Sequence, residues 1–473
     1  MNFNDFSTLL INKFSFNPTD DQKKAIISIS QFLISDKNTS LFILKGYAGT
    51  GKTTLMKTLV DNVKILNYNV CLLAPTGRAA KVLSNYTNKN SYTIHKKIYF
   101  SSVDKFGKFQ TKLKTNKIKN SLFIIDEASM ISDSTNSSDL FRRKSLLSDI
   151  FKYVNFNNNS KIIFLGDTAQ LPPVKQEISA ALNSDFINNT YKLKCLESTL
   201  SQVVRQSNNS GILVNATEIR KNIFNKIYNF DFQFFDDVQI LTDGYEIQEK
   251  IESSYNISGS NNTIIIVRSN KRANLYNQQI RKTILFNENL VSVGDLLIIT
   301  KNNYFWTSEE HNISFLANGD IIEVLEIYSI KELYGFKFAE VKIKMVDYAN
   351  EPVIDTVILL DTLNSEAPSL SYDQSNKLYN EVQKDYTSLK SKYKRFIKTK
   401  ENPFFNALNV KFSYALTCHK SQGGQWPTVF IEKPYLKDGV DIDYLRWLYT
   451  ALIFLTLSAS ARFNLGNIFF AIF

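Results

Sequence analysis

Short apolar runs recur along the chain, and most of them end abruptly in polar or glycine-containing segments. Four such runs occupy residues 41–44, 69–74, 122–125 and 161–165. Stretches with helical periodicity separate them. Continuous apolar runs that alternate with helices are typical of parallel strands covered on both faces. The pattern therefore predicts an α/β fold with parallel sheets.

A different pattern occupies residues 286–404. Apolar and polar residues alternate there in VSVGDLLIIT, NGDIIEVLEI and FKFAEVKIKMV, and Gly-Asp pairs mark turns. Period-two alternation with tight turns predicts a small β-barrel. The charged stretch 379–400 that follows is more typical of a solvated helix than of a binding element.

The first apolar run leads into GYAGTGKT, residues 46–53, and then into a helical pattern. This strand–loop–helix context is the one that a phosphate-binding loop requires, whereas a glycine-rich turn without nucleotide is the alternative. Backbone N–H groups at a helix start favour anions. Lys52 is expected to reach the β- and γ-phosphates, and the Thr53 hydroxyl to bind Mg²⁺. The predicted nucleotide contacts are Gly46, Gly49, Thr50, Gly51, Lys52, Thr53 and Thr54.

Polar residues also follow the other predicted strands, and ligands bind at the carboxyl ends of such strands. Asp126 is expected to hold Mg²⁺ through water, and Glu127 to orient and deprotonate the attacking water. Gln170, in GDTAQLPPV, is expected to sense the γ-phosphate. Arg205 is the best candidate for a second cation on the phosphates. A solvated strand end and a surface arginine on a helix are the corresponding alternatives.

Composition adds a polyanionic partner to this picture. The chain has 473 residues and a formal charge of +11, so it should form roughly two to four domains and favours a nucleic acid. Its cysteines, Cys71, Cys195 and Cys418, lack the spacing of a zinc site or a disulfide framework. That usage fits a reducing cytoplasm. The first residues show no secretory signal pattern.

Two of the three histidines stand in similar surroundings. His95 lies in TIHKK and His419 in TCHKS, each beside hydroxyl and ammonium groups. Such clusters supply donors for a phosphate backbone, although a lone histidine is more often a core or surface residue. Neither histidine has metal-ligand spacing with another.

Blocks spread over most of the chain resemble superfamily 1 helicases, in the branch that includes phage Dda and RecD-like enzymes. The matching blocks are FNPTDDQ, GYAGTGKTT, APTGRAA, TIH, IIDEASM, GDTAQLPPV, VVRQ, IIIVRSNKRANLYNQQIR, LANGDIIEV and YALTCHKSQG. The resemblance implies two RecA-like domains that hydrolyse ATP with Mg²⁺. It also implies movement 5′ to 3′ on single-stranded DNA, with separation of duplexes.

The resemblance also implies roles for individual residues. Gln22 corresponds to a glutamine that reads adenine, and Arg205 to an arginine finger from the second RecA-like domain. Positions that grip the strand or couple it to the nucleotide correspond to Pro75, Thr76, His95, Thr417, His419 and Lys420. Single-stranded DNA and duplex junctions are the expected partners, with a monomer as the acting species and no membrane contact.

The expected domains follow from these blocks. The first RecA-like domain covers 1–98 and 120–200, and the second covers 201–285 and 405–473. A basic hairpin at 99–119 and an SH3-like barrel at 286–404 are insertions. Within the hairpin, Phe106 and Phe109 stand beside lysines. They form a pin that stacks on the first unpaired base, or they pack this small subdomain.

The chain departs from the family near its end. The family block L-Y-x-A-x-[TS]-R places an arginine on the γ-phosphate, but this chain reads LYTALIF, so Phe454 takes that place. An insertion would align Ser460 there instead. The nearly apolar residues 451–473 are long enough to span a bilayer, but Arg462 and interior polar residues favour a final buried strand.

Three functions compete on these observations. The first is an ATP-dependent DNA helicase. The second is a single-stranded nucleic-acid binding protein that holds ATP but hydrolyses it poorly, because its last arginine block is altered. A small-molecule P-loop kinase is the third, and it leaves both strand-gripping blocks unexplained.

Overall fold

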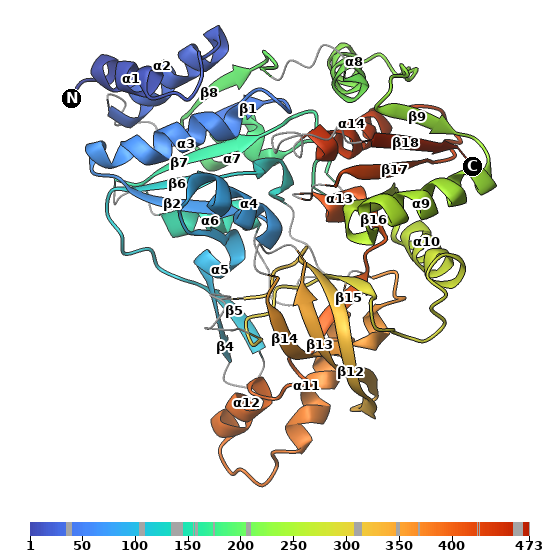
Figure 1. Cartoon of the computed structure of the whole chain (residues 1–473). Helices are drawn as coiled ribbons and strands as arrows, with labels where there is room; N and C mark the ends of the chain where they lie inside the picture. Colours follow the sequence, from blue (N-terminus) through green and yellow to red (C-terminus); the bar gives the residue numbers. More distant parts are fainter. Residues whose placement is uncertain are drawn as a thin grey trace.

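The computed structural model contains two parallel sheets and a closed barrel (Figure 1). Helices flank both sheets, so the fold is of the mixed α/β class, and the sequence prediction of this class is confirmed. The structure describes residues 1–34, 40–103, 109–133, 145–154, 156, 159–173, 176–204, 210–306, 315–346, 351–367, 369–422, 424, 426–456 and 467–472.

The first sheet has the strand order β3-β2-β6-β7-β1-β8, and its neighbouring strands all run parallel. Its strands are β1 (Leu41–Gly46), β2 (Asn69–Ala74), β3 (Ser91–Thr93), β6 (Ser121–Ile125), β7 (Lys161–Gly166) and β8 (Cys195–Leu200). The accompanying helices are α1 (Phe3–Asn12), α2 (Asp20–Ile34), α3 (Lys52–Asn62), α4 (Gly77–Thr87), α5 (Ile94–Ile98), α6 (Leu146–Val154) and α7 (Ser184–Tyr191).

Strand β1 shows why its sequence is apolar without interruption. Phe42 and Leu44 belong to one hydrophobic cluster, which includes residues of α2 and α3. Leu41 and Ile43 belong to another, which includes residues of α6. Because side chains alternate between the faces of a strand, both faces of β1 are covered by helices.

The second sheet is also parallel, with the order β16-β10-β17-β18-β9. Its strands are β9 (Val238–Leu241), β10 (Thr263–Val267), β16 (Ala415–Thr417), β17 (Thr428–Lys433) and β18 (Asn467–Ile472). Its helices are α8 (Gly211–Asn225), α9 (Gly244–Ser258), α10 (Asn270–Thr283), α13 (Cys418–Ser421) and α14 (Ile442–Thr456).

The nearly apolar end of the chain is divided between a helix and a strand. Helix α14 runs to Thr456, and β18 lies between β17 and β9 in the second sheet. The predicted final strand is therefore present, although it occupies only part of the tail. Among the residues described, no helix is long and apolar enough to cross a membrane.

The barrel closes through five strands. They are β11 (Leu296–Ile299), β12 (Ile321–Leu333), β13 (Phe336–Met345), β14 (Val353–Leu359) and β15 (Leu408–Phe412). Since β15 pairs with β11 and β14, the expected barrel boundary at 404 falls before the last barrel strand. The charged stretch forms α11 (Tyr372–Lys384) and α12 (Lys392–Lys400). The basic segment forms the hairpin β4 (Tyr99–Val103) and β5 (Phe109–Leu113).

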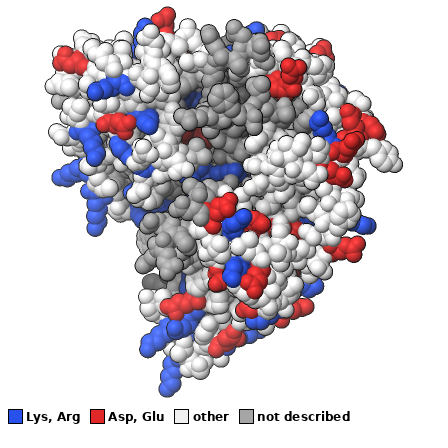
Figure 2. All heavy atoms as spheres, viewed as in Figure 1, with Lys and Arg blue, Asp and Glu red and all other residues white. Residues whose placement is uncertain are grey.

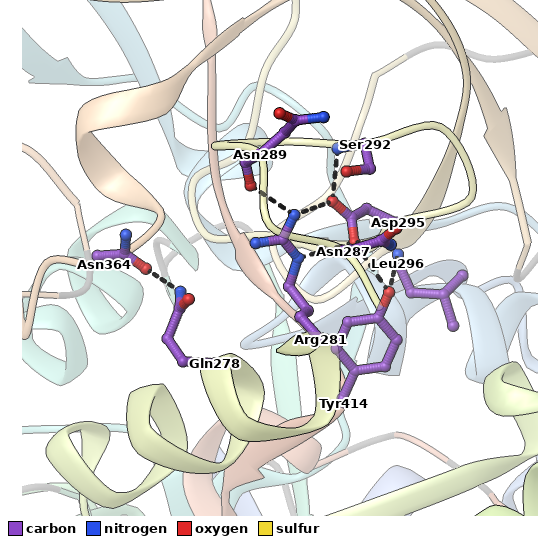
Figure 3. Close-up of polar contacts among 9 residues, drawn as sticks. All are labelled: Gln278, Arg281, Asn287, Asn289, Ser292, Asp295, Leu296, Asn364 and Tyr414. Carbon is purple, nitrogen blue, oxygen red and sulfur yellow. Dashed lines mark hydrogen bonds and ion pairs between the residues drawn. The ribbon is translucent and has the colours of Figure 1, made fainter. Parts of the chain in front are cut away.

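A buried ion pair anchors the barrel to the second sheet (Figure 3). Arg281, at the end of α10, donates to both carboxylate oxygens of Asp295 over 3.0 and 2.9 Å. Tyr414 donates to the same carboxylate over 3.2 Å and lies between the barrel strand β15 and the sheet strand β16. Both charged side chains are at most 3% exposed. The removal of one partner would therefore leave a buried charge unpaired.

We call the first sheet with its helices the first half of the molecule, and the second sheet with its helices the second half. The barrel also contacts helix α4 of the first half. Lys81 Nζ lies 2.6 Å from the buried carboxylate of Asp320. A Cβ atom added at Gly77 would lie 1.9 Å from Cβ of Ala317, so the backbones approach too closely for any side chain at position 77. The barrel is thus in contact with both halves of the molecule.

Candidate nucleotide- and strand-binding site

The parallel topology brings the polar clusters to one edge of the first sheet. The phosphate loop follows β1, the segment 75–80 follows β2, and His95 follows β3. Asp126 and Asp167 follow β6 and β7. Because all these strands run in the same direction, their carboxyl ends lie side by side.

The phosphate loop adopts a conformation that depends on its glycines. Gly49 and Gly51 have φ values of 77° and 81°, in the left-handed region that favours glycine. Helix α3 begins at Lys52, so the loop leads directly into a helix N-terminus. Lys52 Nζ donates to the carbonyl oxygens of Gly46 and Tyr47 over 2.6 and 3.0 Å. The ammonium is thereby held over the loop.

The side-chain amide of Gln22 packs against the phosphate loop. Its Nε2 donates to the carbonyl oxygen of Thr50 over 2.9 Å, and its Oε1 accepts from the Thr19 N–H. A Cβ atom at Gly51 would lie 2.5 Å from that Nε2 atom. Both ends of the amide are therefore engaged with protein atoms here, and adenine recognition by Gln22 stays a prediction. Thr54, which is another of the predicted nucleotide contacts, has its hydroxyl 2.9 Å from the Tyr86 hydroxyl.

Three carboxylates lie close to Lys52 at the strand ends. Burial raises the pKa of Asp126 and of Asp167, and Lys52 opposes both shifts. Burial and the negative charge of Asp126 raise the pKa of Glu127 to about 7. Glu127 has a φ of 49°, which is uncommon for a residue with a side chain, and its N–H donates to Asp126 Oδ1. Such a poised carboxylate is suited to accept a proton near neutral pH.

The donor set here fits Mg²⁺ only as an ion delivered with a nucleotide. No cluster of three or more metal-ligating side chains occurs within the described ranges. One half-buried carboxylate, Asp126, and one hydroxyl, Thr53, leave most coordination positions to phosphate oxygens and water, which is how Mg²⁺ usually binds with nucleotides. The ion would neutralise charge on the phosphates there.

Asp167 was not among the expected site residues, although it lies in the GDTAQLPPV block. The Tyr449 phenol, on α14, donates to Asp167 Oδ2 over 2.7 Å. The same phenol oxygen accepts from the Ala48 N–H of the phosphate loop over 3.2 Å. Tyr449 therefore joins the second half to both the loop and the end of β7.

Two further contacts connect the halves next to Gln170. The Leu171 N–H donates to the Thr450 hydroxyl over 3.0 Å. His419 forms a hydrogen bond with the backbone of Pro172, while burial lowers the pKa of its imidazole. In this structure His419 thus faces the end of GDTAQLPP, and its predicted contact with DNA stays a prediction. Gln170 is half-buried in the same segment.

Arg220 is another residue that the sequence did not single out. It lies on α8, and its guanidinium carbon lies 4.3 Å from the centroid of the Tyr47 ring. Tyr47 is the second residue of the phosphate loop. Arg205, Phe106 and Ser460, by contrast, lie outside the described residues, and of Phe454 only the backbone in α14 is described. The structure therefore places Arg220 beside the loop, and the predicted role of Arg205 stays a prediction.

The predicted strand-binding residues fall on both halves. Pro75 is half-buried, and the Thr76 side chain caps helix α4 by accepting from the Ala79 N–H. His95 is exposed, with its ring centroid 5.8 Å from that of Tyr99.

On the second half, Thr417 and Lys420 line a small cavity together with Lys411. Burial and the positive charge of Lys411 lower the pKa of Lys420 to about 7. An ammonium held in this way would gain from a nearby phosphate.

Charges are distributed unevenly over the face shown in Figure 2. Lys and Arg side chains lie along the left margin, at the lower tip and at the centre between the two halves, whereas Asp and Glu side chains lie mainly towards the right. Arg78 of α4 lies near this junction, with its guanidinium carbon 4.7 Å from the Trp426 ring centroid. Lys96 Nζ likewise lies 4.3 Å from the ring centroid of Phe315, in the barrel. Cations and aromatic rings therefore meet where the two halves and the barrel join.

Two family models match the chain. The AAA domain model matches residues 19–230, and the UvrD-like helicase C-terminal domain model matches residues 412–452. The first match covers all strands of the first sheet, and the second covers β16, α13 and β17 together with most of α14.

Similar proteins and structures agree with these matches. A protein of Acanthamoeba polyphaga mimivirus is 25% identical over 88% of this chain and 94% of its own. The RecBCD enzyme subunit RecD of Buchnera aphidicola is 27% identical over 90% of this chain and 70% of its own. The ATP-dependent DNA helicase Dda of Enterobacteria phage T4 is 27% identical over 65% of this chain and 67% of its own.

A crystal structure of Pif1 helicase from Bacteroides, in complex with ADP-AlF3 and single-stranded DNA, shares the fold. The TM-score is 0.50 at 16% identity, over 96% of this chain and 92% of that one. Together with the phosphate loop, the carboxylates at the strand ends and the barrel insertion, these matches support a superfamily 1 DNA helicase similar to Dda and RecD.

Proposed function

We propose that this chain is an ATP-dependent DNA helicase that moves 5′ to 3′ along single-stranded DNA and separates duplexes ahead of it. The observation that carries the proposal is the joint between the two halves at the phosphate loop. Tyr449 contacts both Ala48 and Asp167 from the second half. A nucleotide bound on the loop would therefore lie where both halves respond to its phosphates.

The chemistry assigned to each residue follows from its position. Lys52 would leave the Gly46 and Tyr47 carbonyls for the β- and γ-phosphates. Glu127, with a pKa raised to about 7 by burial and Asp126, would take a proton from the attacking water. Asp126 and Thr53 would hold the Mg²⁺ that accompanies ATP. Gln170 would report the state of the γ-phosphate to the second half.

The strand would cross both halves. Pro75, Thr76 and His95 would contact it on the first half, and Thr417, His419 and Lys420 on the second. Alternate closing and opening of the halves around ATP would move one set of contacts relative to the other. The acting species is proposed to be a monomer in the cytoplasm, with single strands and forked duplexes as its substrates.

ATP hydrolysis with and without single-stranded DNA tests the motor. Stimulation by DNA is expected in the natural chain, with losses of about 10³-fold or more in Lys52→Ala and Glu127→Gln. Exposed Lys24→Ala, on α2, serves as the control. The absence of any stimulation by DNA would refute the proposal. Duplexes that carry either a 5′ or a 3′ single-stranded tail then test the direction, since only the 5′-tailed substrate should be unwound.

The departure at LYTALIF favours a second candidate, a single-stranded nucleic-acid binding protein that holds ATP but turns it over slowly. Phe454 is neutral and cannot stabilise the negative charge that develops on the phosphates during hydrolysis. Salt-dependent DNA binding, normal ATP affinity and negligible turnover would favour this candidate over the motor. A gain of turnover in Phe454→Arg would then show that the altered block is the cause.

A further inference from the structure

The altered C-terminal block raises the question of which cation faces the γ-phosphate from the second half. The transition state of phosphoryl transfer carries charge on its equatorial oxygens, and one cation beyond the loop lysine usually stabilises it. The family places such an arginine in the last block, where this chain has Phe454. Arg205 is the arginine finger that the resemblance implies, and a further cation on the second half would replace the one that the last block lacks.

Arg220 has the position that such a cation requires. Its guanidinium carbon lies 4.3 Å from the ring centroid of Tyr47. The next residue, Ala48, donates its N–H to Tyr449, which in turn donates to Asp167. Arg220 therefore lies beside the first part of the loop, where the two halves meet.

The positive charge of Arg220 acts on two groups of the first half, Asp167 and Tyr47. Burial raises the pKa of Asp167, while the positive charges of Lys52 and Arg220 oppose the shift. Burial likewise raises the pKa of Tyr47, which Arg220 counteracts. A single carboxylate thus lies within the electrostatic reach of both the loop lysine and an arginine from the opposite half.

The local structure leaves the guanidinium available. Within the described part of the chain, Arg220 forms neither an ion pair nor a hydrogen bond, and its contact with Tyr47 is a cation–π contact. Its neighbour Lys221 differs, because it pairs with Glu218 over 3.5 Å on the exposed side of α8. A planar guanidinium with free donors is suited to phosphate oxygens.

We infer that Arg220 contacts the γ-phosphate of ATP from the second half and supplies the positive charge that position 454 lacks. This inference rests on the proposed ATP hydrolysis. In that reaction the water oxygen forms a bond to the γ-phosphorus, and the bond from the γ-phosphorus to the bridging oxygen breaks. ADP leaves with the electron pair of that bond, and the proton of the water goes to Glu127. Arg220 stabilises the charge on the transferred group throughout.

Nucleotide affinity provides a test that does not depend on turnover. Fluorescent ADP and ATPγS are titrated into the full chain and into Arg220→Ala, Arg220→Lys and Lys221→Ala. Arg220→Ala is expected to weaken ATPγS at least tenfold while ADP changes less than twofold, because only ATPγS carries the third phosphate. Lys221→Ala is expected to match the natural chain. Equal weakening of both nucleotides, or no weakening of either, would overturn the inference.

Steady-state hydrolysis adds the second readout. Arg220→Ala is expected to lower kcat in the presence of single-stranded DNA by about 10³-fold, with KM changed far less, since the contact is strongest in the transition state. Arg220→Lys should retain part of the activity, because it keeps the positive charge but loses the paired N–H donors of the guanidinium. A purely structural role would instead lower the melting temperature and leave kcat per folded molecule unchanged, which would also overturn the inference.

The two proposals fail in distinguishable ways. If the natural chain shows no DNA-stimulated hydrolysis, the motor proposal fails, yet the difference in affinity between ATPγS and ADP still decides the role of Arg220. If Arg220→Ala does not fold, Arg220→Gln, which keeps most of the side-chain volume, takes its place in both measurements.

Discussion

The phenol of Tyr449 donates a hydrogen bond to the carboxylate of Asp167, with 2.7 Å between the two oxygens. The bond joins helix α14 of the second half to the end of β7 in the first. Tyr449 is 2% exposed and Asp167 1%, so water does not compete for either group. Burial raises the pKa of Asp167, and the hydrogen bond from Tyr449 opposes that rise. The joint thus helps to keep Asp167 ionised beside the phosphate loop.

Replacement of Tyr449 by Phe is expected to weaken this joint. The lost hydrogen bond leaves a buried carboxylate oxygen less satisfied, at a cost of about 1–3 kcal/mol. DNA-stimulated ATPase should fall by roughly tenfold or more, while single-stranded DNA binding, measured by fluorescence anisotropy, should persist. Tyr444→Phe on the same helix is the control, because its ring stacks on Trp447 and does not contact Asp167. Normal ATPase in Tyr449→Phe would contradict this role.

Glu127 should make the stability of the nucleotide-free protein depend on pH. Its pKa in the folded protein is raised to about 7 from an ordinary value of 4.5 by burial and by Asp126. Folding therefore favours the protonated carboxyl, and this contribution is present below pH 4.5 and is lost as the pH rises through 7. Glu127→Gln carries no such ionisation.

The expected measurement is urea unfolding without nucleotide or Mg²⁺. The stability of Glu127→Gln relative to the natural chain should increase by about 2 kcal/mol between pH 5 and pH 8. Exposed Glu246→Gln, on α9, is the control and should show no such increase. A difference that is constant with pH would show that Glu127 is not buried as described.

The ion pair between Arg281 and Asp295 is expected to be costly to break. Asp295→Asn would leave a guanidinium that is 3% exposed without its charged partner, and the cost is about 3–5 kcal/mol. The double variant Arg281→Met with Asp295→Leu should recover only part of that loss, because neither charge is then buried but Ser292 and Tyr414 lose their acceptor. Thermal unfolding measures both variants. A loss below about 1 kcal/mol in Asp295→Asn would place the pair in the class of weak surface bridges.

The contact between α4 and the barrel offers a separate test. Gly77→Ala improves helix propensity but places its Cβ 1.9 Å from Cβ of Ala317, so the barrel must shift. The affinity for single-stranded DNA is expected to change severalfold, since Thr76 adjoins this contact. Ala317→Gly in the same chain should partly reverse the change. An unchanged affinity in Gly77→Ala would separate the barrel contact from strand binding.

Sequence reasoning reached the fold class and the phosphate loop because both depend on local pattern. The run before Gly46 is apolar on both faces, and Lys52 follows at the required spacing, so no tertiary contact was needed to place them. The boundary of the barrel was harder to predict from the sequence. LNVKF at 408–412 has the pattern of a strand, but nothing in those residues specifies a barrel instead of a sheet.

Arg220 and Tyr449 could not be found in the same way. Each approaches the phosphate loop only because α8 packs against α14 and α14 against the first half, over segments distant in sequence. The residues around Arg220, EIRKN, carry no motif. Asp167 could have been predicted from the sequence, because it follows a buried strand within GDTAQLPPV. Charge at the end of a second strand was the signal that could have found it.

The barrel strand β15 continues into sheet strand β16 through Ser413 and Tyr414, with Tyr414 fixed on Asp295. No free linker lies at this crossing, so the barrel and the second sheet form a single lever. A rotation of the barrel and the second sheet about the contact at Tyr449 would shift Ala317 and Asp320 against α4. The proposed binding of ATP at the phosphate loop would in this way be coupled to the position of Thr76, next to α4.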